Sequence, residues 1–184
     1  MGFFFWKGVN LQIKKIQVVY EIRKIKVEEK SLLISLMDRY FTEIAEYDFD
    51  QNASSSIREY PYLDSYWGET NRIPLFIYAE KKQIGFALIN EFVLLKRYKK
   101  VRSIAEFYIL PGYRRKGIGR KVAFDLFQKY GLNWEIRQQI GNEPAQKFWL
   151  SVINTYTEGD FEDVFYNNGT YHVRIQLFSN QSIA

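Results

Sequence analysis

Residues 111–119 (PGYRRKGIG) carry the clearest chemical signal in this sequence. They follow a strand-like apolar run and lead directly into a helix-like amphipathic run. Glycines at positions 117 and 119 let a ligand approach the backbone. The N–H groups of a helix's first turn lack intrahelical acceptors and can donate to phosphate oxygens. The segment therefore predicts a cradle for an anion at the start of a helix.

Basic side chains surround this cradle. They are Arg114, Arg115, Lys116, Arg120 and Lys121. With a helix dipole that favours a nearby anion by roughly 0.3–1 kcal/mol, they fit a phosphate-bearing ligand, as does the net charge of +5. The segment is not a P-loop, because no Gly-Lys-Ser/Thr follows. It is not a Rossmann fingerprint either, because the first glycine is missing.

The composition excludes several other kinds of chemistry. The chain of 184 residues contains no cysteine, which rules out a disulfide scaffold, a thiolate metal site and a cysteine nucleophile. Its one histidine, His172, argues against a histidine zinc site or a Ser-His triad, and we expect no metal. The length fits one domain, and an apolar fraction of 47 % is enough for a packed core.

The elements that must position the cradle alternate between strand and helix patterns. Strands are predicted at 20–26, 75–79, 84–95, 103–110, 132–138, 156–166 and 170–178, and helices at 27–40 (with an acidic continuation to 50), 60–67 (short helix or turn), 117–130 and 142–152. Residues 167–169 (NNG) mark the turn of a terminal hairpin. The order β-α-α-β-β-β-α-β-α-β-β predicts a mixed α/β sheet in one domain.

Two blocks of residues together resemble a known family. Residues 109–119 (I-x-P-x-Y-R-x-x-G-x-G) look like motif A of the GCN5-related N-acetyltransferases, the GNAT family. Residues 142–149 (NEPAQKFW) are similar to that family's motif B, N-x-x-A-x-x-F-Y. The surrounding order of strands and helices matches too, so the resemblance covers residues 20–178. It implies a single-domain GNAT-like fold, a mixed and mostly antiparallel sheet flanked by helices, with a splay between the two central strands.

The resemblance also implies a site for acetyl-coenzyme A (acetyl-CoA) as cosubstrate. The pyrophosphate would lie on the backbone of Arg114, Arg115, Lys116, Gly117, Ile118 and Gly119. The pantetheine would pair with the main chain of Phe107, Tyr108 and Ile109, bond to Asn142 and pack against Phe148. A backbone N–H near Ile109 would polarise the thioester carbonyl, which contributes about 3 kcal/mol in comparable sites.

The catalytic groups follow the family pattern only in part. Where the family often places a tyrosine that protonates the departing thiolate, this chain has Trp149, whose indole cannot do so. Tyr156 or Tyr108 can take that role, or water can, or the thiolate leaves unaided, since a thiol pKa of about 8.5 makes it a fair leaving group. Glu106 is the candidate general base, acting directly or through a water; the alternative is a salt bridge to a neighbouring Arg or Lys.

The acceptor pocket is less well defined by the sequence. An acidic stretch (Glu43, Glu46, Asp48 and Asp50) can attract a cationic amine, or it is simply a solvated helix face and loop. An aromatic group (Tyr60, Tyr62, Tyr66 and Trp67) either lines the same pocket or belongs to the core. We expect a small-molecule or peptide amine, whose identity the pattern does not give.

These observations favour an N-acetyltransferase in which a primary amine attacks acetyl-CoA directly in a ternary complex. The alternative is a non-catalytic CoA-binding or regulatory domain, suggested by Trp149. A nucleic-acid-binding module is disfavoured, because the basic run at 96–102 is too short for a footprint.

The two ends of the chain look different from its centre. Residues 1–20 form an extension, either with an extra strand at 11–20 or from a translation start that is not the native one. The domain spans 21–178, and a polar tail follows at 179–184. The apolar run at 1–6 stops at Lys7 and is too short for a signal peptide or a membrane span. We therefore expect a cytoplasmic protein without a membrane partner. A homodimer through an exposed strand edge is left open.

Overall fold

The predicted order of elements is present in the computed structural model, which describes residues 19–47 and 60–180. The strands are β1 (Tyr20–Lys24), β2 (Ile73–Ala79), β3 (Lys82–Asn90), β4 (Val101–Ile109), β5 (Asn133–Gln139), β6 (Glu162–Asn167) and β7 (His172–Ser179). The helices are α1 (Lys30–Ile44), α2 (Ser65–Gly68), α3 (Ile118–Tyr130) and α4 (Glu143–Thr157), with short 3-10 turns at Val27–Glu29, Ala45–Tyr47 and Pro111–Tyr113.

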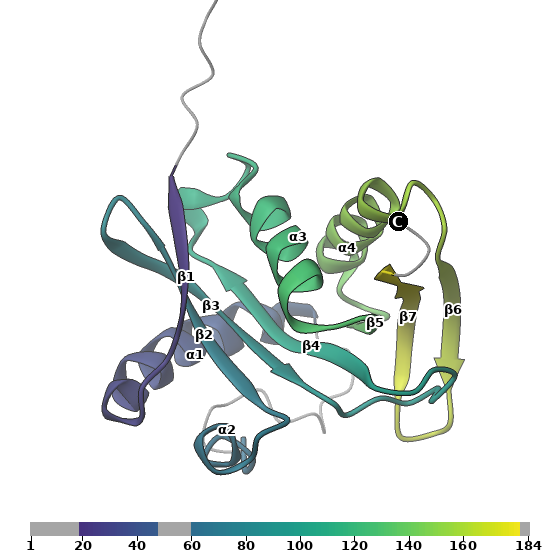
Figure 1. Cartoon of the computed structure of the whole chain (residues 1–184), viewed down its shortest axis with the longest axis horizontal. Helices are drawn as coiled ribbons and strands as arrows, with labels where there is room; N and C mark the ends of the chain where they lie inside the picture. Colours follow the sequence, from purple (N-terminus) through teal and green to yellow (C-terminus); the bar gives the residue numbers. More distant parts are fainter. Residues whose placement is uncertain (1–18, 48–59, 181–184) are drawn as a thin grey trace, which may run out of the picture.

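The strands form one seven-stranded sheet in the order β1-β2-β3-β4-β5-β7-β6. All neighbours pair antiparallel except β4 and β5, which are parallel. Helices α3 and α4 lie side by side on one face of the sheet, and α1 packs on the other face (Figure 1). The fold class expected from the sequence, a mostly antiparallel mixed sheet flanked by helices, is confirmed.

Each face of the sheet has its own core. On one face, α1 buries a stripe at three- and four-residue spacing, Leu33, Leu36, Met37 and Phe41, against strand residues such as Phe86. On the other face, α3 and α4 bury Val122, Leu126, Trp149 and Ile153. Full burial of such a side chain contributes about 1.5–3 kcal/mol. The two cores hold the central strands rigidly between them.

The two central strands separate soon after they meet. β4 pairs with β5 at only two positions, Val101 with Asn133 and Arg102 with Trp134. Where β4 pairs with β3, the register shifts by one residue between Leu88 and Ile89, so that Ala105 is an extra residue in β4. Beyond this point the inner edge of β4 is not paired with β5, and the expected splay is present.

The sequence interpretation was wrong about the strand expected at 156–166. Helix α4 continues to Thr157, and β6 begins only at Glu162. Val152, Ile153 and Tyr156 keep helical spacing, and the helix ends where Glu158 (φ 54°) and Gly159 (φ 91°) adopt left-handed conformations. The β-branched residues of this segment favour a strand, but the packing of α4 against α3 stabilises the helix.

The strand expected at 84–95 is also shorter than predicted, because β3 ends at Asn90. The next backbone groups find side-chain acceptors instead of a sheet partner. The Phe92 N–H donates to Asn90 Oδ1 (3.0 Å), and the Leu94 and Leu95 N–H groups donate to the Glu135 carboxylate (2.6 and 3.0 Å). These bonds hold residues 92–95 against β5, outside the ladder of β3.

The terminal predictions fall mostly outside the described residues. The extra strand expected at 11–20 is described only from residue 19, and the tail only as far as residue 180. β1 begins at Tyr20 and β7 reaches Ser179, close to the domain limits of 21 and 178. Among the helices described, none has the length and apolar character needed to cross a membrane.

Candidate active site

The backbone of the loop between β4 and α3 curls around an open space. Arg115 has a φ of 59° and Gly117, at the N-cap of α3, a φ of 77°. Such left-handed residues turn successive N–H groups inward and form a concave site for an anion. A Cβ placed on Gly117 would meet no atom within 4 Å, so the space above this glycine is free for a ligand.

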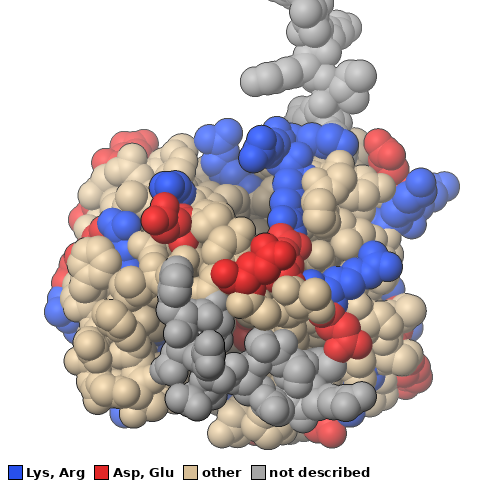
Figure 2. All heavy atoms as spheres, turned by 180° about the vertical axis from the view of Figure 1, so that it is seen from behind, with Lys and Arg blue, Asp and Glu red and all other residues tan. Residues whose placement is uncertain are grey.

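The first turn of α3 offers hydrogen-bond donors to that space. The Lys121 N–H donates to the Gly117 carbonyl (3.2 Å), which leaves the N–H groups of Ile118, Gly119 and Arg120 without intrahelical acceptors. No side chain caps this helix, and its first turn contains no acidic residue. Lys and Arg side chains gather along the upper part of the face seen from behind (Figure 2). The start of α3 therefore presents unpaired backbone N–H groups, which is the arrangement that an anion cradle requires.

Arg114 differs from the other basic residues because its side chain is already engaged. Its Nε donates to the Ile109 carbonyl (2.6 Å), and its two terminal nitrogens donate to the Glu43 carboxylate. Its guanidinium also lies 5.3 Å from the centre of the Tyr108 ring. Glu43 therefore anchors the loop to α1 and is not a free member of the acidic stretch. Of the rest of that stretch, Glu46 is exposed, and Asp48 and Asp50 lie outside the described residues.

The inner edge of β4 presents main-chain groups to the splay. The Leu110 N–H donates to the Ile84 carbonyl of β3 (2.8 Å), and bonding alternates along an antiparallel pair. Tyr108 therefore turns its main chain toward β3, whereas Phe107 and Ile109 turn theirs toward the splay. The Ile109 carbonyl accepts a hydrogen bond from Arg114. The main-chain groups that face the splay without such a partner are therefore the Ile109 N–H and the N–H and carbonyl of Phe107.

Aromatic side chains join the two sequence motifs at this edge. The Phe107 ring stacks on the Phe148 ring, with centroids 5.8 Å apart, and lies 5.2 Å from the Trp149 ring. A Cβ on Gly119 would lie 3.4 Å from the Phe148 ring. The structure thus brings Phe107, Gly119 and Phe148 together from β4, α3 and α4, next to the cradle.

Glu106 lies on the opposite side of β4 from these rings. The Tyr40 hydroxyl of α1 and the Tyr60 hydroxyl make polar contacts with its carboxylate, and the Arg137 charge on β5 acts on it. These three groups favour the ionised form, but desolvation by the surrounding core is stronger and raises the pKa of Glu106 to about 7. A carboxyl with such a pKa can take up a proton near neutral pH.

Comparison with known proteins agrees with this geometry. The family model described as the acetyltransferase (GNAT) family matches residues 34–152, from α1 through the cradle into α4. This chain belongs to the GNAT family. The resemblance seen in the two sequence motifs is therefore confirmed. Among curated proteins, none matches the sequence.

Solved structures share the GNAT fold with this chain. The aminoglycoside acetyltransferase AAC(6')-Ib in complex with coenzyme A has a TM-score of 0.63 at 14 % identity, covering 90 % of this chain and 97 % of that one. Spermidine N-acetyltransferase from Vibrio cholerae, with CoA and spermine, has a TM-score of 0.57 at 15 % identity (89 % and 96 % covered). The PaiA N-acetyltransferase from Thermoplasma acidophilum, with coenzyme A, has 0.58 at 15 % (88 % and 99 %). At these identities the likeness shows the fold alone.

The raised pKa of Glu106 predicts how the stability of this GNAT domain depends on pH. A carboxyl whose pKa rises from 4.5 to about 7 on folding binds more protons in the folded state between these values. Stability is therefore lost as pH rises from 4.5 to 7, by about 3 kcal/mol. Glu106→Gln removes this loss, so it should stabilise the protein more at pH 8 than at pH 5. Urea unfolding at both pH values measures this, and an equal effect at both would contradict it.

Asn142 has a structural task in the second motif. Its Oδ1 accepts the Ala145 N–H (3.0 Å) and so caps α4, which leaves its amide NH2 available to a ligand. We predict that Asn142→Ala lowers the free energy of unfolding by about 1 kcal/mol. Asn142→Asp should keep the cap and the stability while removing the amide donor. Chemical denaturation of both variants tests the cap, and similar losses in both would show that the cap is not responsible.

Tyr156 does not lie at the splay between β4 and β5. Its ring packs among Phe124, Phe127 and Phe178, with centroid distances of 5.1, 5.1 and 5.9 Å. Phe148, which stacks on Phe107 at the edge of β4, lies two turns nearer the start of α4. Because its ring is enclosed by these other rings, the arrangement gives no support to Tyr156 as the acid. Trp149 is 6 % exposed and fills the core beside Phe107.

The sequence did not predict that three residues, Tyr40, Tyr60 and Arg137, surround Glu106. Tyr40 stands at the end of a predicted helix and received no role, Tyr60 was assigned to a pocket or the core, and Arg137 received no role. All three act on Glu106. Of the other aromatics, Tyr66 is buried, Trp67 donates to the Ile25 carbonyl (3.1 Å) and Tyr62 is 60 % exposed. The alternation of apolar and polar residues along 132–138 places Arg137 on the polar face of that strand. This was the only signal in the sequence that could have pointed to Arg137.

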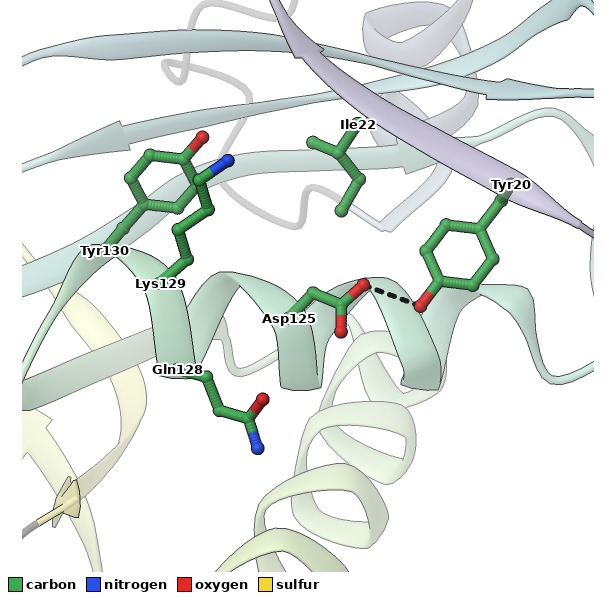
Figure 3. A pocket seen from close by; sticks show the side chains of 6 residues that line it. All are labelled: Tyr20, Ile22, Asp125, Gln128, Lys129 and Tyr130. Carbon is green, nitrogen blue, oxygen red and sulfur yellow. Dashed lines mark hydrogen bonds between the residues drawn. The ribbon is translucent and has the colours of Figure 1, made fainter.

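A hollow on the surface lies beside β1. It measures about 500 Å³ and lies between β1 and the outer face of α3, where the Tyr20 hydroxyl donates to Asp125 (2.7 Å; Figure 3). Its other lining residues are Ile22, Gln128, Lys129 and Tyr130. It adjoins neither the cradle nor Glu106. Within residues 19–47 and 60–180, no three His, Asp or Glu side chains converge in a way that could hold a metal ion.

Proposed function

We propose that this protein is an N-acetyltransferase that moves the acetyl group of acetyl-CoA to a primary amine by direct attack in a ternary complex. The observation that carries the proposal is the place of Glu106 on β4, beyond the point where β4 and β5 separate, with polar contacts from Tyr40 and Tyr60 to its carboxylate. Membership of the GNAT family and the CoA complexes of similar folds support the choice of cosubstrate.

The residues of the cradle fit the phosphates of CoA. The open space at Gly117 and the free N–H groups of Ile118, Gly119 and Arg120 would receive the pyrophosphate. The side chains of Arg115 and Lys116 add positive charge. Arg114 would contribute only its main chain to the phosphate site, because its side chain is bonded to Ile109 and Glu43. The main chain of Phe107 would pair with the pantetheine, and Phe148 would pack against it.

Glu106 then acts as the general base. It takes a proton from the ammonium form of the acceptor, directly or through a water, and the nitrogen lone pair that this frees attacks the thioester carbonyl. The polar contacts from Tyr40 and Tyr60 hold the carboxylate in place. The Ile109 N–H, which faces the splay, would donate to the carbonyl oxygen as negative charge develops on it.

No protein acid is required for the leaving group. Tyr156 is enclosed among other rings, and burial raises the pKa of its hydroxyl. Tyr108 interacts with Glu43 on the α1 side. A thiolate whose conjugate acid has a pKa near 8.5 departs without protonation. The protein therefore accelerates the reaction mainly by positioning, proton removal and charge stabilisation.

A panel of primary amines tests the reaction, with thiol release from acetyl-CoA as the readout. Release that depends on both the amine and the protein supports the proposal. If acetyl-CoA binds and no amine in a broad panel is acetylated, the protein is instead a non-catalytic CoA-binding domain, the reading that Trp149 suggests.

A further inference from the structure

Arg137 is a largely buried cation that the proposed reaction does not use. It lies on β5 beyond the point where β4 and β5 separate, and its side chain is only 16 % exposed. Burial lowers the pKa of its guanidinium, because desolvation outweighs the neighbouring negative charges. A buried charge of this kind needs hydrogen-bond partners to be stable.

The protein supplies few such partners. In the described part of the chain, the Arg137 guanidinium donates no hydrogen bond, and its one ion pair is with Glu135 at 4.0 Å from Nε. Both oxygens of Glu135 already accept backbone N–H groups, from Leu94 and Leu95. The donor groups of a rigid, planar guanidinium are therefore left for something else.

Arg137 and Glu106 face the same space. Continuing the parallel register from Arg102 and Trp134, and allowing for the extra residue Ala105, places Glu106 opposite Arg137 across the splay. The charges of the two groups act on each other, and Tyr60 acts on both. The base and the cation are thus neighbours on the α1 side of the sheet.

The rim beside Arg137 is aromatic and open. The guanidinium lies 4.9 Å from the centre of the Phe92 ring, and that ring is 6.2 Å from the ring of Tyr171. Phe92 is 49 % exposed and Tyr171 37 %. These two rings therefore offer exposed aromatic surface beside the cation, against which an apolar group of a ligand can pack.

We infer that Arg137 binds a carboxylate of the acceptor, which is a small amine of the amino-acid type. The inference rests on the proposed function. Two parallel N–H groups of the guanidinium would hold the carboxylate, while the amine points to Glu106. One guanidinium matches the single charge of a carboxylate. Arg72, by contrast, is paired with Glu69 and lies over the Tyr62 and Tyr66 rings.

The same observations disfavour a polycationic acceptor. A polyamine needs an acidic surface, but Glu43 is committed to Arg114 and a guanidinium lies beside the base. Arg137 is in this account a specificity residue, since it touches the acceptor and not the bond that reacts.

Matched pairs of reaction products test this assignment without needing turnover. N-acetyl-L-phenylalanine is compared with N-acetylphenethylamine, and the leucine and tyrosine pairs likewise, by calorimetry with and without saturating CoA. In at least one pair the carboxylate member should bind at least tenfold more tightly. Arg137→Gln should abolish this preference, and Arg137→Lys should keep only part of it. The control Arg97→Gln, which removes a cation paired with Glu162 at the surface, should leave it unchanged.

Three results would overturn the inference: no binding of any pair, equal binding within every pair, or a preference that survives Arg137→Gln. Titration with acetyl-CoA in the same buffer separates this from the fate of the proposed function. If acetyl-CoA binds and neutral amines are acetylated as well as amino acids, only the role of Arg137 is wrong. If acetyl-CoA does not bind, the proposed function is wrong, and the measurements without CoA still decide whether Arg137 holds a carboxylate.

Discussion

Glu106→Gln is expected to lower kcat for the best amine of the panel by 10²–10³-fold, in the range typical for loss of a general base. The neutral amide has nearly the same shape as the carboxyl but cannot accept the proton. The affinity for acetyl-CoA should change less than twofold, because Glu106 lies on the α1 side of β4 and the CoA groups would lie at its edge and beside α4.

The pH profile makes this prediction specific. The base works only when ionised, so the wild-type rate should rise with pH up to about 7, the pKa of Glu106, and then level off. This limb should be absent from the residual activity of Glu106→Gln. Glu80→Gln, at an exposed turn between β2 and β3, is the matched control and should behave as wild type. If Glu106→Gln keeps more than a tenth of the activity and its rate still rises with pH up to about 7, Glu106 is not the general base.

Gly117→Glu is expected to weaken acetyl-CoA binding at least a hundredfold. The new side chain would fill the open space above the N-cap and would place a negative charge where the phosphates must lie. At acetyl-CoA concentrations a hundred times the dissociation constant, the wild type should gain about 2.7 kcal/mol of stability. The variant should gain less than about 0.5 kcal/mol.

Gly169→Glu is the matched control for this substitution. Gly169 also has a positive φ (85°) and no atom within 4 Å of its Cβ position, but it lies in the hairpin turn between β6 and β7. Both variants should lose about 1 kcal/mol of stability from backbone strain. Only Gly117→Glu should lose acetyl-CoA binding in a calorimetric titration. Equal affinity in the two variants would show that the cradle does not hold the phosphates.

The local parts of the site were predictable from the sequence. The cradle depends on consecutive residues between Pro111 and Gly119, so glycine spacing and helix-start rules suffice to find it. Glu106, on the predicted strand that leads into the cradle, was the candidate base. The splay was expected only from the family resemblance, because it depends on how β4 and β5 pair, and neither strand contains a local signal for it.

The surroundings of Glu106 were not predictable in the same way. Tyr40, Tyr60 and Arg137 come from α1, from the segment before α2 and from β5, and only the folded sheet brings them together. Their effect on the pKa of Glu106 depends on burial, which a one-dimensional pattern does not show. Tyr156 was misplaced for a related reason: tertiary packing on α3 extends α4 beyond the predicted end.

The most direct test of the account is a calorimetric titration of the unmodified protein with acetyl-CoA. We predict one site per chain and a stability that rises with acetyl-CoA concentration, because the free N–H groups at the start of α3 and the open backbone at Gly117 form a preorganised phosphate site. The absence of both heat and stabilisation at millimolar acetyl-CoA would contradict the account, since neither Glu106 nor an amine acceptor would then have a cosubstrate to act on.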